Sequence, residues 1–499
     1  MSLMSETQSE NTRYAFTPTV GIGRLPSPTY PSLDQEGPNS VSDALGRLAD
    51  TLGWSNEDGP LGRVIPAGAR VLVKPNLVLH HNEDPRFQGP DGIDCLVTHA
   101  SLIRAAVEAA LQTRAAEVLV GDAPIQGCDF NELLRVTGLD NWAREQRDRD
   151  PRFVGVRDFR RTTCVLMHGV RVAAEDVQPE DQFALFDLGH ESLLEPISTN
   201  EDRFRVAWYD HRLMAKTHHP GKHQYLVAKE VVEADVIINL PKLKTHKKAG
   251  VTCALKNLIG INGNKEYLPH HRLGGPQTGG DNYPDDGFVK RALELVTDRQ
   301  NVTNSYAGGM GWHLLFALLA RASRASGDRV GMDGSWSGND TIWRTCLDLN
   351  RVLLYGRADG TMSEEIQRRV VHIVDAIVSG QGNGPLAPEP LGFGLLLGGN
   401  NAAAIDWVAA QLLAYDAEKV SLVRHAFDQF RWPITRFASG SVRVVGDLGA
   451  GDPRPVLSAV CRPVKHPIGW QDAANEESKA WVGDDGVGIA ATSVDPRDA

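Results

Sequence analysis

A basic segment in the middle of the chain contains the side chains best suited to chemistry. PKLKTHKK (241–248) places four lysines and a histidine directly after the apolar run ADVIIN (234–239). An apolar run that a proline ends is typical of a buried strand, and we expect a loop after it. Ligands of α/β proteins usually bind where strands end, so lysines at this point favour a small anion as ligand. A solvated surface loop is the alternative interpretation of such a charge run.

Lys256 lies ten residues after His246. The stretch between them includes the small and apolar AGVTCAL (249–255). We expect a helix to begin there, with its amino end open towards an anion and Lys256 about one turn inside it. Apolar surroundings lower the pKa of a lysine, which prepares its amine for chemistry.

Two earlier segments also end in polar groups. RVLVKPNL (70–77) and EVLVGDAP (117–124) are expected strands, and they carry Lys74, Asn76 and Asp122 at their ends. A lysine there suits a carboxylate or phosphate, and an aspartate can accept a ligand hydroxyl or bind a metal. A structural Lys-Pro turn and a helix cap explain the same residues equally well. The complete set predicted to bind substrate is Lys74, Asn76, Asp122, Lys242, Lys244, Thr245 and Asn257.

A histidine pair follows Lys256. His270 and His271 precede the glycine-rich stretch GGPQTGGDNYPDD (274–286). This stretch is expected to fold over Lys256 as a lid, which would make the histidines metal ligands or groups that complete the site. Surface histidines in a mobile loop are the alternative.

The wider pattern predicts the fold. Apolar runs alternate with helical periodicity, as in SLIRAAVEAALQTR (101–114) between the two strands named above. We therefore predict an α/β protein with a mostly parallel sheet, helices on both faces and irregular insertions. The expected divisions are a disordered start at 1–15, a first α/β portion at 16–150, an insertion or cap at 151–230, a second α/β portion at 231–480 with a glycine-rich lid at about 265–345, and a disordered tail at 481–499.

Composition excludes several classes of protein. A net charge of −11 argues against nucleic acid as partner, because phosphate binding needs a broad basic surface. Six cysteines without a Cys-x-x-Cys pair disfavour an iron–sulfur protein. MGWHLLFALLARA (310–322) is too short to span a bilayer, so we expect an amphipathic or buried helix there and a cytoplasmic protein without a membrane span.

The blocks of this sequence resemble a known family. ADVIINLPKLKTHKKAGVTCALKNLIG (234–260) is similar to the signature of the bacterial and archaeal family called "domain of unknown function 362". KPNL (74–77), GDAP (121–124), WRTCLDLNR (343–351) and DAIVSGQGNGP (375–385) resemble its other blocks in order, so the resemblance covers roughly residues 65 to 420. Many relatives carry ferredoxin-like cysteine motifs, which are absent from this sequence. The family implies no particular reaction.

A second resemblance is more remote. His246, Ala249-Gly250 and Lys256 are similar in order and spacing to a segment of the nickel-pincer lactate racemase family. That resemblance implies that His246 is the acid/base group and that Lys256 carries a cofactor or forms a Schiff base. TCALK (252–256) stands where the racemases have a glycine-rich stretch.

Three functional hypotheses follow. The first is an enzyme, racemase/isomerase-like or lyase-like, that moves a proton on a small carboxylate or phosphate at a Lys/His pocket. The second is a binding or accessory protein of a biosynthetic or maturation pathway, which captures the same anion without turnover. The third is an iron–sulfur redox protein, which the cysteine spacing disfavours. The cofactor stays open between a metal and a lysine-linked group.

Overall fold

The computed structural model describes residues 11–475, apart from residues 13, 35–36, 168–169, 286, 304 and 326–329. The tail predicted to be disordered at 481–499 lies outside these residues, as does most of the predicted disordered start. Ala15, at the end of that start, is buried, and its carbonyl oxygen accepts a hydrogen bond from Asn401. Ala15 therefore belongs to the packed part of the described chain.

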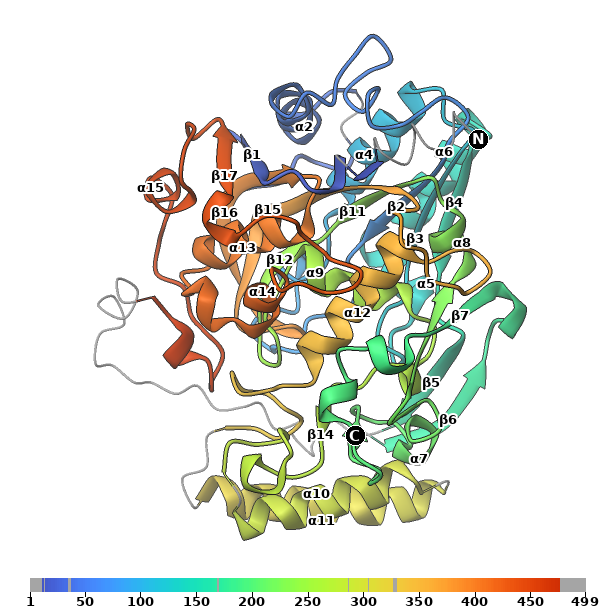
Figure 1. The fold of residues 1–499 in the computed structure, drawn as a ribbon, viewed down its shortest axis with the longest axis vertical. Coiled ribbons are helices and arrows are strands. Elements are labelled where there is room, and N and C mark those ends of the chain that lie inside the picture. Colours follow the sequence, from blue (N-terminus) through green and yellow to red (C-terminus); the bar gives the residue numbers. More distant parts are fainter. Residues whose placement is uncertain are drawn as a thin grey trace.

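A ten-stranded mixed sheet forms the centre of the molecule (Figure 1). Its main path runs in the order β17 (Arg443–Gly446), β1 (Thr19–Arg24), β16 (Ala387–Gly399), β15 (Arg369–Asn383), β11 (Val236–Leu240), β2 (Arg70–Pro75), β3 (Glu117–Asp122) and β4 (Phe153–Asp158). Neighbouring strands from β15 to β4 are parallel, while β16 is antiparallel to both of its neighbours. This arrangement confirms the predicted mostly parallel sheet.

Both faces of the sheet are buried, as expected for parallel strands. On β2, Val71 and Val73 pack into one core while Leu72 packs into another. The first core lies under α2 (Ser40–Thr51) and α4 (Ala100–Gln112), and α12 (Ile342–Tyr355) and α13 (Ala402–Leu412) pack on the opposite side (Figure 1). The helices on that first side also include α3 (Pro90–Asp94), α5 (Phe130–Val136) and α6 (Leu139–Arg149).

The basic segment forms a strand, which corrects the predicted loop. β12 (Lys242–His246) pairs in parallel with β15, and β13 (Gly250–Thr252) pairs antiparallel with β12. The cause is the length of β15 and β16, which continue as a hairpin through Gly380, Gly382 and Gly384. A Cβ atom at Gly384 would lie 1.9 Å from the carbonyl oxygen of Thr245, so this close approach requires glycine.

The predicted insertion at 151–230 contains mostly short strands. β4 belongs to the main sheet, and β7, β10 and β9 form a separate three-stranded sheet. The remaining elements here are β5 (Thr162–Met167), β6 (Val170–Asp176), β7 (Phe183–Asp187), β8 (Phe204–Arg205), α7 (His211–Met214), β9 (His218–His219), β10 (Lys222–Ala228) and, just beyond, α8 (Lys229–Glu233).

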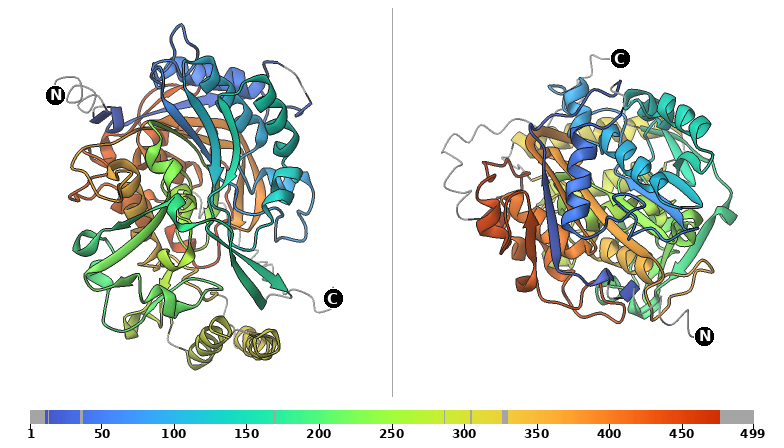
Figure 2. Two further views of the ribbon diagram at one scale, coloured as in Figure 1. Left: turned by 90° about the vertical axis from the view of Figure 1, so that its right-hand side faces the viewer. Right: turned by 90° about the horizontal axis from the view of Figure 1, so that it is seen from above.

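The predicted glycine-rich lid instead contains two long helices. β14 (His271–Arg272) pairs with β8 and leads to α10 (Phe288–Asn301) and α11 (Tyr306–Ala325). The two helices lie together at one end of the molecule, away from the sheet (Figure 2). The short helices α14 (Ser421–His425) and α15 (Pro453–Leu457) belong to the C-terminal part.

Among the described residues, no helix is both long and apolar enough to cross a membrane. The cytoplasmic location stays a prediction from the sequence.

Candidate functional site

β12 brings the basic side chains into the interior. All five of its side chains are buried, together with Lys248 and Lys256 beyond it. Burying an ammonium group is costly unless an anion compensates it. The partner of each lysine therefore decides what that lysine does.

Lys242 is fully neutralised within the protein. Its Nζ donates to Asp375 Oδ2 at 2.6 Å, to the Tyr30 hydroxyl at 2.6 Å and to the Val378 carbonyl at 3.2 Å. Tyr30 in turn donates to Asp375 Oδ1 at 2.6 Å. Lys242 and Asp375 are completely buried, so this predicted substrate ligand forms an internal ion pair.

Lys74 and Asp122 form a second internal pair. Lys74 Nζ lies 2.6 Å from Asp122 Oδ1, and the other carboxylate oxygen accepts the backbone N–H of Leu77 at 2.6 Å. A Cβ atom at Gly260 would lie 1.9 Å from Asp122 Oδ1, so the backbone closes over the pair. The predicted substrate ligands Lys74 and Asp122 therefore bind each other.

Three further lysines have no such partner. Lys244 Nζ donates only to neutral oxygens, at 2.5 Å to the Leu96 carbonyl and at 3.3 Å to Asn76 Oδ1. Within the described part of the chain, the ammonium groups of Lys248 and Lys256 make neither a hydrogen bond nor an ion pair, but the nearby carboxylate of Asp333 opposes the lowering of the Lys248 pKa. Burial lowers the pKa of Lys244 to about 7 and that of Lys248 to about 8, and it also lowers the pKa of Lys256.

These three lysines lie near one another. The Lys256 charge contributes to the lowered pKa of both Lys244 and Lys248. We call Lys244, Lys248 and Lys256 the lysine cluster. Burying several ammonium groups close together without hydrogen-bonded carboxylates is energetically unfavourable. A bound anionic ligand would offset this cost.

His246 lies within the lysine cluster in a defined tautomer. Its Nδ1 accepts the backbone N–H groups of Lys248 at 3.0 Å and Ala249 at 3.1 Å. Burial, followed by Lys256, Lys244 and Lys248, holds the His246 pKa well below its usual value. The imidazole is therefore neutral near pH 7 with its proton on Nε2, which makes Nε2 a hydrogen-bond donor.

His270 has the opposite tautomer. Its Nδ1 donates to the carbonyl oxygen of Leu268 at 2.7 Å, which leaves Nε2 as an acceptor. Burial, Lys256 and Lys248 hold its pKa well below the usual value, so it too is neutral. The site thus combines one neutral histidine that donates through Nε2 with one that accepts through Nε2.

The amino end of the helix that carries Lys256 is already occupied, contrary to the expectation of an open anion site. α9 (Ala254–Asn257) has only four residues, and the N–H groups of Ala254 and Leu255 donate to Asp406 at 2.7 and 3.2 Å. Burial raises the pKa of the Asp406 carboxyl to about 7. The lysine side chains, rather than this helix end, are the groups available to an anion.

A network of hydrogen-bonded amide side chains lies next to the lysine cluster. Asn76 donates to Asn257 at 3.1 Å, Asn257 donates to Asn239 at 2.7 Å, and Asn239 donates to His372 Nδ1 at 3.0 Å. Thr245 uses its hydroxyl on the Gly382 carbonyl at 2.9 Å. Asn76, Asn257 and Thr245, all predicted to bind substrate, hold the strands around the site together.

The donor set for a metal is incomplete. Among the described residues, no group of three or more His, Cys, Asp or Glu side chains is placed to hold a metal ion. His271, the neighbour of His270, has a buried Nδ1 without a hydrogen bond and faces a different cavity, so ligation by His270 and His271 stays a prediction. Burial lowers the pKa of the Lys256 amine, and a lysine-linked cofactor stays a prediction as well.

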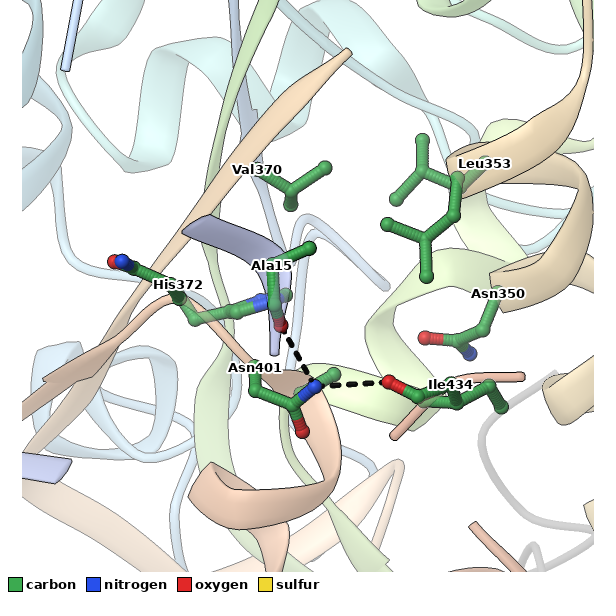
Figure 3. Close-up of a pocket in the computed structure, with 10 residues that line it drawn as sticks. Ala15, Asn350, Leu353, Val370, His372, Asn401 and Ile434 are labelled. Carbon is green, nitrogen blue, oxygen red and sulfur yellow. Dashed lines mark hydrogen bonds between the residues drawn. The ribbon is translucent and has the colours of Figure 1, made fainter. Parts of the chain in front are cut away.

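A small cavity lies elsewhere in the described part of the chain. It has a volume of about 10 Å³, and its walls include His372, Asn350, Asn401 and Ala15 (Figure 3). Asn401 spans one wall by donating to the carbonyl oxygens of Ala15 and Ile434. No lysine lines this cavity, and it has room for about one water molecule, so it does not compete with the lysine cluster as an anion site.

Two residues of the candidate site differ from the prediction. Lys248 was not predicted as a site residue, and His270 was predicted in another role. Lys248 belonged to the basic run, and its period-two alternation with Lys242, Lys244 and His246 is the pattern of a strand that could have indicated it. His270 was predicted as a metal ligand, and its role as an acceptor follows only from its contact with Leu268.

The fold and site define an α/β protein with a buried lysine–histidine cluster at the end of a parallel strand. Residues 190–411 match the model of the family described as "Domain of unknown function (DUF362)", so this part of the chain is similar to that family. The match includes β12, α9 and α12, and so covers the lysine cluster. No curated protein matches the chain.

Two solved structures are similar to the chain at low identity. A protein from Thermotoga maritima is 12% identical with a TM-score of 0.29, over 71% of this chain and 53% of its own. The lactate racemase apoprotein from Thermoanaerobacterium thermosaccharolyticum is 11% identical with a TM-score of 0.29, over 79% of this chain and 62% of its own. This chain therefore spans about half to three fifths of each protein. At such TM-scores neither superposition assigns a role to any residue here.

Proposed function

We propose that this protein is an enzyme that binds a small carboxylate or phosphate at the lysine cluster and moves a proton on it with His246 and His270. The observation that carries the proposal is the burial of Lys244, Lys248 and Lys256 without a hydrogen-bonded carboxylate among the described residues, where Asp122 and Asp333 act on Lys244 and Lys248 only from a distance. An anionic ligand would supply the missing negative charge, and it would raise the pKa of each lysine.

The two histidines divide the proton chemistry between them. His270 Nε2 carries a lone pair and can take a proton from a carbon next to the bound anion. The Nε2 proton of His246 can be donated as a hydrogen bond to the oxygen on which negative charge then develops. The remote resemblance implies that His246 is the base. The tautomers favour His270 as the base instead, because only its Nε2 has a free lone pair. The anionic substrate itself would raise the pKa of His270 and strengthen it as a base.

Sulfate should bind to the lysine cluster. Its charge does not change near neutrality, so it reports the protein groups alone. We expect sulfate to raise the melting temperature of the wild-type protein more than chloride does at equal ionic strength. Lys244→Met and Lys256→Met should weaken sulfate binding by about tenfold or more, since a charge-assisted contact is worth about 1.5–3 kcal/mol. Isothermal titration would measure the affinity.

General salt effects are separated by a matched variant. Lys419→Met removes a surface lysine far from the cluster in the sequence, and it should leave sulfate binding unchanged. Equal sulfate binding by the wild type and Lys256→Met would contradict the proposed site.

The affinity for sulfate should fall as the pH rises above about 7. The pKa of Lys244 is lowered to about 7 and that of Lys248 to about 8, so raising the pH through these values removes positive charge from the free site. For each group the loss is at most about tenfold per pH unit above its pKa. Lys244→Met should flatten the lower part of this profile. A pH-independent affinity would show that Lys244 is not in the site.

A further inference from the structure

The α10–α11 hairpin has large apolar side chains that no other described residue covers. On α11, Leu314 and Leu318 are each 63% exposed, and on α10 Phe288 is 85% and Leu295 63% exposed. α11 buries only Gly309 and Ser323 over its whole length. Large apolar side chains exposed together on one element are typical of contact surfaces.

The hairpin also has a charge opposite to that of the whole chain. Residues 288–325 contain five lysines and arginines and two carboxylates, a formal charge of +3, whereas the whole chain carries −11. Both carboxylates are used inside the protein: Glu294 accepts from Asn282 and Asp298 pairs with Arg205. Arg299, Arg321 and Arg324 are exposed. In the described part of the hairpin, the charged side chains on the exposed face are therefore cations.

The hairpin is anchored to the rest of the described chain at its root. Glu294 and Asp298 anchor α10 to the segment that carries β8 and β14. A cavity of about 20 Å³ lies at this root, and its walls include His271 and Asp333, which border the candidate site. Besides this root, α11 contacts β6, and the leucines and arginines named above lie on the exposed part of the hairpin.

We propose that the α10–α11 hairpin docks onto an anionic phospholipid surface. Leu314, Leu318 and Phe288 would enter the boundary between headgroups and acyl chains, while the arginines would lie among anionic headgroups. The acidic remainder of the chain would be repelled by the same surface, which orients the molecule with the hairpin towards the lipid. A symmetric contact between two copies would bring the exposed arginines of both hairpins together. The described hairpin residues offer no exposed carboxylate to compensate these charges, so the two hairpins would repel each other.

Vesicle sedimentation of the full-length protein tests this proposal. With about 30 mol% phosphatidylglycerol in phosphatidylcholine, we expect binding at least about tenfold stronger than to phosphatidylcholine alone. Leu314→Asp with Leu318→Asp should reduce this binding about tenfold or more. Arg321→Gln with Arg324→Gln should reduce the preference for anionic vesicles by about fivefold for each arginine, and high salt should have the same effect.

A matched control uses Leu185, which is 42% exposed on β7, outside the hairpin. Leu185→Asp should bind vesicles like the wild type, and circular dichroism with thermal melting would show that every variant is folded. The arginine variants keep the proposal testable if the leucine variants fail to fold. A monomer that ignores anionic vesicles would overturn the proposal. A dimer that Leu314→Asp dissociates, without vesicle binding by the wild type, would overturn it in favour of a second copy of this chain.

Discussion

Replacing His270 by glutamine should abolish proton exchange on substrate while leaving anion binding intact. In heavy water, we expect the wild-type protein to exchange a carbon-bound hydrogen of at least one small anion. This hydrogen lies next to the carboxylate, or next to the carbonyl group of a phosphate ester. Suitable candidates are hydroxy acids, amino-acid derivatives and sugar phosphates. A positioned general base contributes about 10²–10⁴-fold to the rate, so His270→Gln should slow the exchange by that factor. Proton NMR would follow the loss of the signal.

His246→Gln is the matched control for this experiment. Glutamine offers an N–H donor but no base that titrates near neutrality, so it replaces what His246 supplies and not what His270 supplies. We expect a loss of about tenfold or less at position 246, because the donor is retained in a changed geometry. Both variants should bind sulfate within about twofold of the wild type, since the lysine cluster is intact. A large loss for His246→Gln with little loss for His270→Gln would reverse the two roles.

Much of the fold follows from the sequence because the buried strands are continuous apolar runs. β2, β3 and β11 all lie within runs that indicate strands, and each packs on both faces. β12 was missed because its charged side chains indicate solvent, although their period of two is that of a strand. Its pairing partner is the extension of β15, more than a hundred residues later, and no local pattern shows how far that strand continues.

The lysines of the candidate site differ in the partners that the structure gives them. The sequence predicts Lys74, Lys242 and Lys244 as substrate ligands that follow strands, and Lys256 as a catalytic lysine inside a helix. The structure separates them by their partners, because Asp122 neutralises Lys74 and Asp375 neutralises Lys242. Neither carboxylate lies near its lysine in the sequence. The same holds for Asp406, which occupies the end of α9 from about 150 residues away.

The longest apolar segment shows a similar limit. The sequence predicts an amphipathic or buried helix at 310–322, and α11 is indeed a helix there. Whether its leucines are covered depends on what packs against them, which periodicity does not reveal. The exposed face became visible only when α10 and the three-dimensional placement of the hairpin were known (Figure 2).

Asp375→Asn should strongly destabilise the protein, in contrast to Lys244→Met. The change leaves Lys242 with its charge buried and uncompensated, and breaking a buried ion pair from one side costs about 3–5 kcal/mol of the free energy of unfolding. Lys242→Met combined with Asp375→Leu removes both charges, and it should recover much of this loss. A smaller cost of about 1–3 kcal/mol would remain, because Tyr30 loses its acceptor.

Lys244→Met should raise the melting temperature instead. The folded-state pKa of Lys244 is lowered to about 7, below its value in the unfolded chain, so protonation favours unfolding. The penalty is present in full below about pH 7 and disappears as the pH rises towards the usual lysine pKa, so the gain from methionine should be largest at low pH. Differential scanning calorimetry of both variants across this pH range would measure the two effects. The opposite result, no effect of Asp375→Asn and a loss of stability for Lys244→Met, would show that Lys244 has a structural role. Lys244 would then not belong to the anion site, and the predicted pH dependence of sulfate binding would fail.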